Sequence, residues 1–89
     1  MRRIHAIISG QVQGVGFRYH TQRVSERLQL TGWVRNLPDG TVEAEVEGDQ
    51  ESVEKLLAWL GDGPAGARVR HVRVTDITPA GGSGFDVRF

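Results

Sequence analysis

The sequence predicts an α+β fold, in which two helices lie on one face of a four-stranded antiparallel sheet and a short strand follows at the C-terminus. Some stretches show the alternation of apolar and polar residues that is typical of strands, and others show the apolar spacing that is typical of helices. Along the chain they occur in the order β-α-β-β-α-β. No repeat, linker or low-complexity segment interrupts that order. The chain has 89 residues, so residues 1–89 are expected to form a single domain with one modest core.

The first half of the chain predicts a strand, a helix and a hairpin. Apolar residues alternate along residues 3–10, which predicts a central strand, and recur at helical spacing over 17–29, which predicts a helix. A second strand is expected over 30–36. A turn is expected at 37–40, where the sequence is Leu-Pro-Asp-Gly, because proline fixes φ and glycine tolerates a positive φ. Residues 41–47 then complete a hairpin.

The strand over 41–47 alternates between apolar residues and glutamates. Its valines and alanine are expected to face the core, while Glu43, Glu45 and Glu47 are expected to form a solvated face.

A second helix is expected after this strand. Asp49 or Ser52 is a candidate cap, and apolar residues recur from Val53 at the i, i+3, i+4 and i+7 positions of one helical face. The sequence Gly-Asp-Gly-Pro at 61–64 ends the helix.

Two further strands complete the order. After a loop over 64–68, valines at 72 and 74 mark a fourth strand. A glycine-containing loop over 79–84 precedes the alternating residues 85–89, which predict a short edge strand. This order is that of the ferredoxin-like βαββαβ sandwich.

Composition excludes several classes of protein. The 11 basic and 11 acidic residues give no net charge, which argues against a general nucleic-acid binder. The chain has no cysteine, so disulfides, thiol catalysis and thiolate metal sites are excluded. No apolar stretch approaches the ~20 residues of a membrane span, and no signal peptide is recognised. A cytoplasmic protein is therefore expected, and a monomer is taken as the default because no pattern in the sequence encodes an oligomeric state.

Residues 10–18, Gly-Gln-Val-Gln-Gly-Val-Gly-Phe-Arg, are the most informative stretch. They connect the first predicted strand to the first helix. Free N–H groups in such a turn, together with the helix dipole, favour a bound anion. Arg18 adds a planar fork of donors that suits phosphate oxygens. The stretch therefore predicts a pocket for a phosphoryl group.

A plain tight turn is the alternative for this stretch. Gly10, Gly14 and Gly16 do not match the dinucleotide pattern G-x-G-x-x-G, and the Gly-Lys-Ser/Thr of a Walker loop is missing. From the residues alone, phosphate binding and a plain turn stand as equal alternatives.

Asn36 is the second candidate site residue, at the end of the second predicted strand. It could simply begin the turn, a common position for asparagine. In a β-α-β-β order, however, the end of this strand and the loop after the first strand need not lie far apart. An amide there could hold a water molecule, and its contribution would be positioning, because asparagine is not a strong base.

The remaining candidates favour structural roles. His5, His20 and His71 are dispersed without metal-ligand spacing, and His20 is the histidine nearest to the proposed site. Trp33 and Trp59 are expected to pack. An RNA-binding module on this fold would carry paired aromatic residues on its first and third strands, where this chain has isoleucines and glutamates.

Two motifs resemble the acylphosphatase family. Residues 10–18 resemble its first signature, and Gly-Trp-Val-Arg-Asn-Leu-Pro-Asp-Gly-Thr-Val at 32–42, running on to Gly48, resembles the second. Gly-Pro at 63–64, Ala-Arg-Val at 67–69 and the Phe-x-Val-x-aromatic ending also fit. The likeness covers nearly the whole chain. The final Phe89 stands where the family often has tyrosine.

The resemblance implies an enzyme that hydrolyses the carboxyl–phosphate bond of acyl phosphates, without metal, cofactor or covalent phospho-enzyme. Its partners would be a small acyl phosphate and inorganic phosphate. By likeness, Arg18 holds the phosphate and Asn36 orients the attacking water. The expected phosphate-binding residues are Gln13, Gly14, Val15, Gly16, Phe17 and Arg18.

A non-catalytic anion-binding or regulatory module on the same fold is the alternative. Acylphosphatase-like domains also occur inside larger hydrogenase-maturation proteins, where they process carbamoyl phosphate; a chain ending at Phe89 is not expected to belong to that setting.

Overall fold

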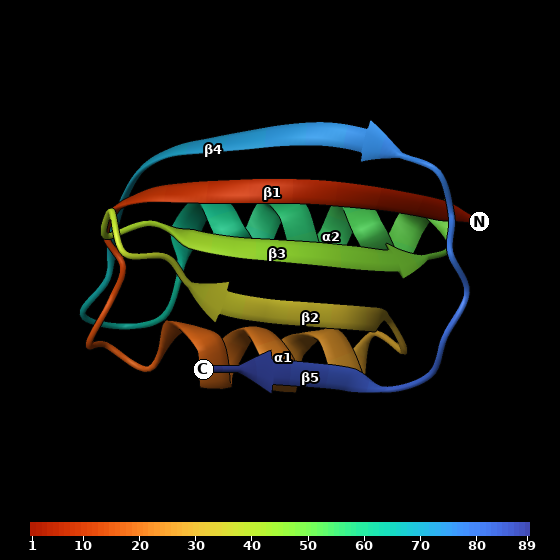
Figure 1. Cartoon of the computed structure of the whole chain (residues 1–89), viewed down its shortest axis with the longest axis horizontal. Coiled ribbons are helices and arrows are strands. Elements are labelled where there is room, and N and C mark those ends of the chain that lie inside the picture. Colours follow the sequence, from red (N-terminus) through yellow and green to blue (C-terminus); the bar gives the residue numbers. More distant parts are fainter.

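The computed structural model describes residues 1–89 and confirms the predicted order of elements (Figure 1). The elements are β1 (Arg2–Gln11), α1 (Phe17–Arg27), β2 (Thr31–Asn36), β3 (Val42–Gly48), α2 (Gln50–Asp62), β4 (Arg68–Ile77) and β5 (Phe85–Arg88). Most boundaries lie within a residue or two of those expected. The largest difference is at β4, which begins at the end of the predicted loop because its first residues already pair with the end of β1.

All five strands form one sheet in the order β4-β1-β3-β2-β5. The strands β4, β1, β3 and β2 pair antiparallel, which confirms the predicted four-stranded arrangement. The C-terminal strand β5 joins the same sheet at its edge, next to β2, and this pair is parallel. The sheet is therefore mixed, and its two ends in space are the last two strands of the chain.

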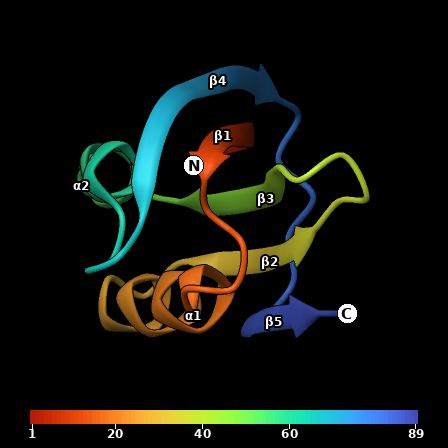
Figure 2. The same ribbon diagram turned by 90° about the vertical axis from the view of Figure 1, so that its left-hand side faces the viewer.

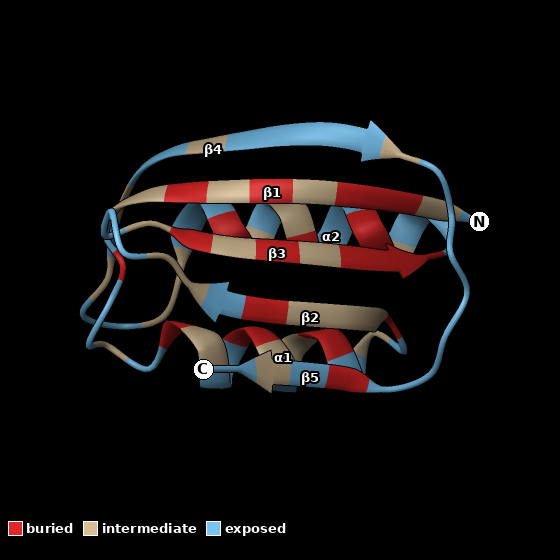
Figure 3. Cartoon of the chain, viewed as in Figure 1, coloured by how far each residue is buried: buried red, intermediate tan, exposed pale blue.

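Both helices lie on the same side of the sheet, as Figure 2 shows. The core fills the space between these layers. Ile4, Ala6 and Ile8 of β1 are fully buried and lie opposite the buried valines and alanine of β3, which is the face that the alternation predicts (Figure 3). The helix α2 contributes Val53, Leu56 and Leu60 to this core.

Asp49 is the N-terminal cap of α2, and not Ser52, the other candidate in the sequence. Its carboxylate accepts a hydrogen bond of 2.8 Å from the main-chain N–H of Ser52. This bond lowers the pKa of Asp49 below its ordinary value. The helix ends at Asp62 and is capped by Gly63, whose φ of 72° turns the chain and whose N–H donates to the carbonyl of Trp59.

The helix α1 ends earlier than its apolar spacing predicts. It stops at Arg27, and Gln29 has a left-handed φ of 60°. The fully buried residues of α1 are Phe17, Thr21 and Ser25, whereas Val24 and Leu28, whose spacing predicted the helix, are partly buried and pack against the core. Two of these three residues are small, so the helix can lie close to the sheet.

The expectation that the β3 glutamates form a solvated face is wrong for Glu47. Only 3% of this residue is exposed, because the loop between β4 and β5 passes the end of β3 (Figure 1). The N–H of Ala80 donates to its carboxylate at 2.7 Å, and Arg3 Nη1 lies 3.2 Å from the same oxygen. The N–H bond from Ala80 and the ion pair with Arg3 hold the pKa of Glu47 below its ordinary value.

Glu43 and Glu45 are half-buried and also paired. Glu45 accepts from Arg3 at 2.9 Å, and Glu43 contacts His5 Nε2 at 2.8 Å and Arg35 Nε at 2.6 Å. Burial alone would raise the pKa of Glu43, but these two hydrogen bonds outweigh it and the pKa is lowered. The face of the sheet opposite the helices is thus a network of ion pairs.

Neither helix combines the length and the apolar character that crossing a membrane would require.

Candidate active site

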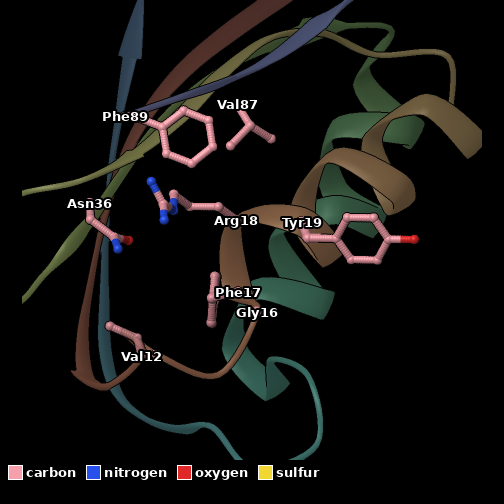
Figure 4. A pocket seen from close by; sticks show the side chains of 9 residues that line it. Val12, Gly16, Phe17, Arg18, Tyr19, Asn36, Val87 and Phe89 are labelled. Carbon is pink, nitrogen blue, oxygen red and sulfur yellow. The ribbon is translucent and has the colours of Figure 1, made fainter.

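A pocket opens at the end of the sheet where β1 leads into α1 (Figure 4). Its volume is about 180 Å³, which is below the ~300–1,000 Å³ of pockets for drug-sized ligands and suits a small ligand. Segments far apart in the sequence line it. The lining residues are Val12, Gly14, Gly16, Phe17, Arg18, Tyr19, Asn36, Val87 and Phe89.

The loop between β1 and α1 has a backbone that only glycine adopts readily. Gly14 and Gly16 have φ values of 77° and 75°, and no atom within 4 Å of Gly14 would obstruct a side chain. Conformation, not crowding, therefore requires glycine at this position. Gly16 is also the N-terminal cap residue of α1, and no side chain caps that end of the helix.

The main-chain N–H groups of residues 13–19 donate to no acceptor within the protein. The first intrahelical bond of α1 is made by the N–H of His20 to the carbonyl of Gly16. A continuous run of free donors thus follows the loop into the positive end of a helix dipole. Free donors and a positive dipole end both favour an anion.

Arg18 brings the positive charge to this pocket. Its Nη1 donates to the main-chain carbonyl of Arg88 at 3.1 Å, and its guanidinium carbon lies 4.6 Å from the ring centroid of Phe89. None of the ion pairs in the structure includes Arg18. No acidic side chain lines the pocket either, so the charge of Arg18 is available to an anionic ligand.

Asn36 enters the same pocket from the last position of β2, where it pairs with Val42 of β3. Its side-chain amide has no hydrogen-bond partner within the protein, so both its donor and its acceptor are free. Figure 4 shows this amide near the guanidinium of Arg18. The structure thus brings together the loop after the first strand and the end of the second, as the element order suggested.

The six predicted phosphate-binding residues divide into two groups. Gly14, Gly16, Phe17 and Arg18 line the pocket, whereas the side chains of Gln13 and Val15 do not. Val15 packs against the core.

The side chain of Gln13 faces the turn after β2. Its Nε2 donates to the carbonyls of Leu37 at 2.8 Å and Thr41 at 2.9 Å. That turn is itself held by Asp39, whose carboxylate accepts from the Thr41 hydroxyl at 2.6 Å, which lowers the pKa of Asp39. Gln13 therefore braces the loop, and only its N–H group belongs to the run of free donors.

Phe17 forms the inner side of the pocket. It is 2% exposed, and its ring packs against Trp59 of α2 with centroids 5.6 Å apart. The start of α1 is thereby anchored to the core, which holds the adjacent donors in place.

Sequence reasoning missed the contribution of β5. Val87 and Phe89 line the pocket because β5 pairs with β2, which brings the C-terminus beside Arg18. The alternation of residues 85–89 predicted the strand but contained no signal for its neighbour.

Val12 and Tyr19 were also missed, although they flank the glycine loop. The ring of Tyr19 points away from Asn36 in Figure 4, and its hydroxyl accepts a hydrogen bond of 2.7 Å from Arg23.

Other titratable groups lie outside the pocket. His20 does not line it, and its ring packs edge-on against Tyr19 with centroids 5.3 Å apart. No three His, Asp or Glu side chains are grouped as metal ligands would be.

The chain matches known proteins along almost its full length. The model of the family described as Acylphosphatase matches residues 4–87. A curated acylphosphatase of Thermococcus kodakarensis is 54% identical over 85 residues, covering 96% of this chain and 93% of that protein. The crystal structure of acylphosphatase from Bacillus subtilis is 32% identical, superposes with a TM-score of 0.97 and covers all of both chains. An acylphosphatase structure from Coxiella burnetii, 44% identical, has a TM-score of 0.95 and covers 98% of this chain and 92% of that one.

These matches include both signature stretches, and the matching structures share the fold that positions the pocket. The chain therefore belongs to the acylphosphatase family of hydrolases.

Proposed function

We propose that this pocket hydrolyses the carboxyl–phosphate bond of acyl phosphates, releasing a carboxylate and inorganic phosphate, without a metal ion or cofactor. One observation carries the proposal. A run of free N–H groups and an arginine that forms no ion pair stand beside an unpartnered asparagine amide, in a pocket that suits a small ligand. Membership of the acylphosphatase family supports the same reaction.

The loop and Arg18 bind the phosphoryl group. The transition state of phosphoryl transfer is loose, and its charge is spread over the peripheral oxygens. Donors aimed at those oxygens stabilise it, and each well-placed donor contributes about 10²–10³ in rate. The N–H groups of residues 13–18 supply such donors, and the fork of Arg18 supplies two more.

Asn36 orients the water. Its carbonyl oxygen accepts from the water and its N–H₂ donates, so the water oxygen is held toward phosphorus. As the new O–P bond forms, the bond from phosphorus to the acyl oxygen breaks and its electron pair leaves with the carboxylate. The water proton passes to a phosphoryl oxygen. A carboxylate is a weak base, so its departure needs no general acid, and the site needs no strong base.

We also propose that the enzyme acts as a cytoplasmic monomer. Arg18, Asn36 and the loop with free N–H groups all belong to one chain, so the proposed reaction needs no residue from a second copy. Light scattering on the purified protein should give the mass of one chain.

Steady-state kinetics with acetyl phosphate in the presence of a chelator tests the proposal. The native enzyme should turn over, and Asn36→Ala should lose at least about 10²-fold in kcat while inorganic phosphate still inhibits with an unchanged constant. Arg18→Ala should weaken substrate and phosphate binding together.

Two outcomes would contradict the proposal. Full activity in Asn36→Ala would remove the role of that amide. Phosphate binding by the native protein without any turnover would favour the non-catalytic anion-binding module instead.

A further inference from the structure

The pocket has an apolar side that phosphate binding does not use. Four large hydrophobic residues are exposed on the surface, and two of them, Tyr19 and Phe89, line this pocket. The ring of Tyr19 is engaged with Arg23 and points away. Phe89, which is fully exposed, and the half-buried Val87 remain as the apolar surface open to a ligand.

Val87 and Phe89 form one wall, which we call the β5 wall. Val87 belongs to β5 and Phe89 directly follows the strand; both line the pocket, and Figure 4 shows them together above Arg18. Arg88, which lies between these two residues, is held by two contacts. Its main-chain carbonyl accepts from Arg18 at 3.1 Å, and its guanidinium stacks on Trp33 at 4.6 Å.

We propose that the β5 wall is the subsite for the acyl group of the substrate, and that it favours apolar and especially planar aromatic acyl groups. This inference rests on the proposed function. An acyl phosphate held by its phosphoryl group at Arg18 projects its acyl group from the same place, and the Phe89 ring stands 4.6 Å from that guanidinium. Arg18 lies on the ring of Phe89, which otherwise remains fully exposed and can stack with an aromatic acyl group.

The alternative role for Phe89 is to orient Arg18 through their stacking contact. This role predicts a different result. A misplaced Arg18 weakens binding of every phosphoryl group equally, whereas a lost acyl subsite penalises an aromatic acyl group more than a small one. The ratio of kcat/KM between two substrates therefore separates the two roles.

The experiment compares benzoyl phosphate with acetyl phosphate for the native enzyme and for Phe89→Ala, Phe89→Tyr and Val74→Ala. Phe89→Ala should lose about two- to tenfold more kcat/KM with benzoyl phosphate than with acetyl phosphate. Phe89→Tyr keeps the ring and should preserve the native ratio. Val74 is an exposed hydrophobic residue of β4 outside the pocket, so Val74→Ala should preserve it too.

The other outcomes of this experiment would overturn either the acyl subsite alone or the proposed function as well. An equal loss for both substrates in Phe89→Ala would overturn the acyl subsite and leave Phe89 as a positioning residue for Arg18, with the proposed function intact. Failure of the native enzyme to hydrolyse either substrate would overturn the proposed function, and the subsite with it.

Discussion

Gln13 and Leu37 are joined by a hydrogen bond of 2.8 Å, from the side-chain amide of the one to the main-chain carbonyl of the other. The same amide reaches the carbonyl of Thr41 at 2.9 Å. The loop that carries the free N–H groups is thereby tied to the turn that directly follows Asn36. The two halves of the proposed site come from different elements, and one side chain thus fixes their relative position.

Gln13→Ala is expected to lower kcat/KM about ten- to a hundredfold, because a shift of ~1 Å between catalytic groups can cost that much. Steady-state kinetics with acetyl phosphate measures the effect. Gln50→Ala is the control, since Gln50 lies at the start of α2 and bonds only to Glu54. A loss of stability in Gln13→Ala with kcat/KM unchanged would show that the two bonds serve the fold alone.

Gly16→Ala is expected to weaken both the fold and phosphate binding. A side chain at φ 75° costs about 1–2 kcal/mol, and relief of that strain would turn the free N–H groups. Gly84 has a φ of 74° and nothing within 4 Å, so Gly84→Ala carries the same strain away from the pocket. Urea unfolding should show similar losses for both variants, and only Gly16→Ala should raise the inhibition constant of phosphate. Equal phosphate inhibition in the two variants would contradict the role of the loop.

Arg18→Lys keeps the charge but removes the planar fork. Arg18 already donates one N–H to the carbonyl of Arg88, and an ammonium cannot keep that bond and also grip a phosphate with two parallel bonds. The loss of one charge-assisted hydrogen bond, about 1.5–3 kcal/mol, predicts a roughly ten- to hundredfold weaker phosphate inhibition. Arg23→Lys, one and a half turns along α1 and outside the pocket, should have little effect. Retention of native phosphate affinity in Arg18→Lys would mean that charge alone suffices.

The stability of the fold should depend on pH through Glu47. Its pKa is lowered in the folded state by the N–H of Ala80 and by Arg3. A lowered pKa gives stability that is present above the unfolded value of about 4.3 and is lost as the pH falls below it. Urea unfolding from neutral pH to about pH 3 should therefore show a steeper acid loss in the native protein than in Glu47→Gln. The exposed Glu26 forms no ion pair, so Glu26→Gln should follow the native curve; parallel curves for all three proteins would exclude the Glu47 contribution.

Removal of each of two buried hydroxyls on α1 should have opposite effects on the free energy of unfolding. Ser25 Oγ is buried without a hydrogen-bond partner, so Ser25→Ala should leave the free energy of unfolding unchanged or raise it by up to about 1 kcal/mol. The Thr21 hydroxyl donates to the carbonyl of Phe17 at 2.7 Å, so Thr21→Val should cost about 1 kcal/mol. Urea denaturation measures both, and a destabilised Ser25→Ala would indicate that its hydroxyl has a partner.

Much of the fold is predictable from local pattern. The alternation of β1 and β3 identifies the core residues correctly, because side chains of a strand point to opposite faces with a period of two. The glycine-rich stretch likewise predicts its own backbone, since positive φ at Gly14 and Gly16 is a property of the residues themselves. The acidic face of β3 was less predictable. Alternation says which way Glu47 points but not that a loop from the end of the chain covers it.

The sequence by itself therefore determined the kinds of element, the inward faces of the strands and the loop with its arginine, because each depends on residues a few positions apart. Only the tertiary structure decided which strands became neighbours. The parallel pairing of β5 with β2 brings Phe89 to Arg18. This pairing uses backbone groups at the edge of β2, and no local sequence pattern predicts which strand β5 will pair with. The proposed phosphate-binding loop is thus encoded in one short stretch of sequence, whereas the proposed acyl subsite depends on the pairing of β5 with β2.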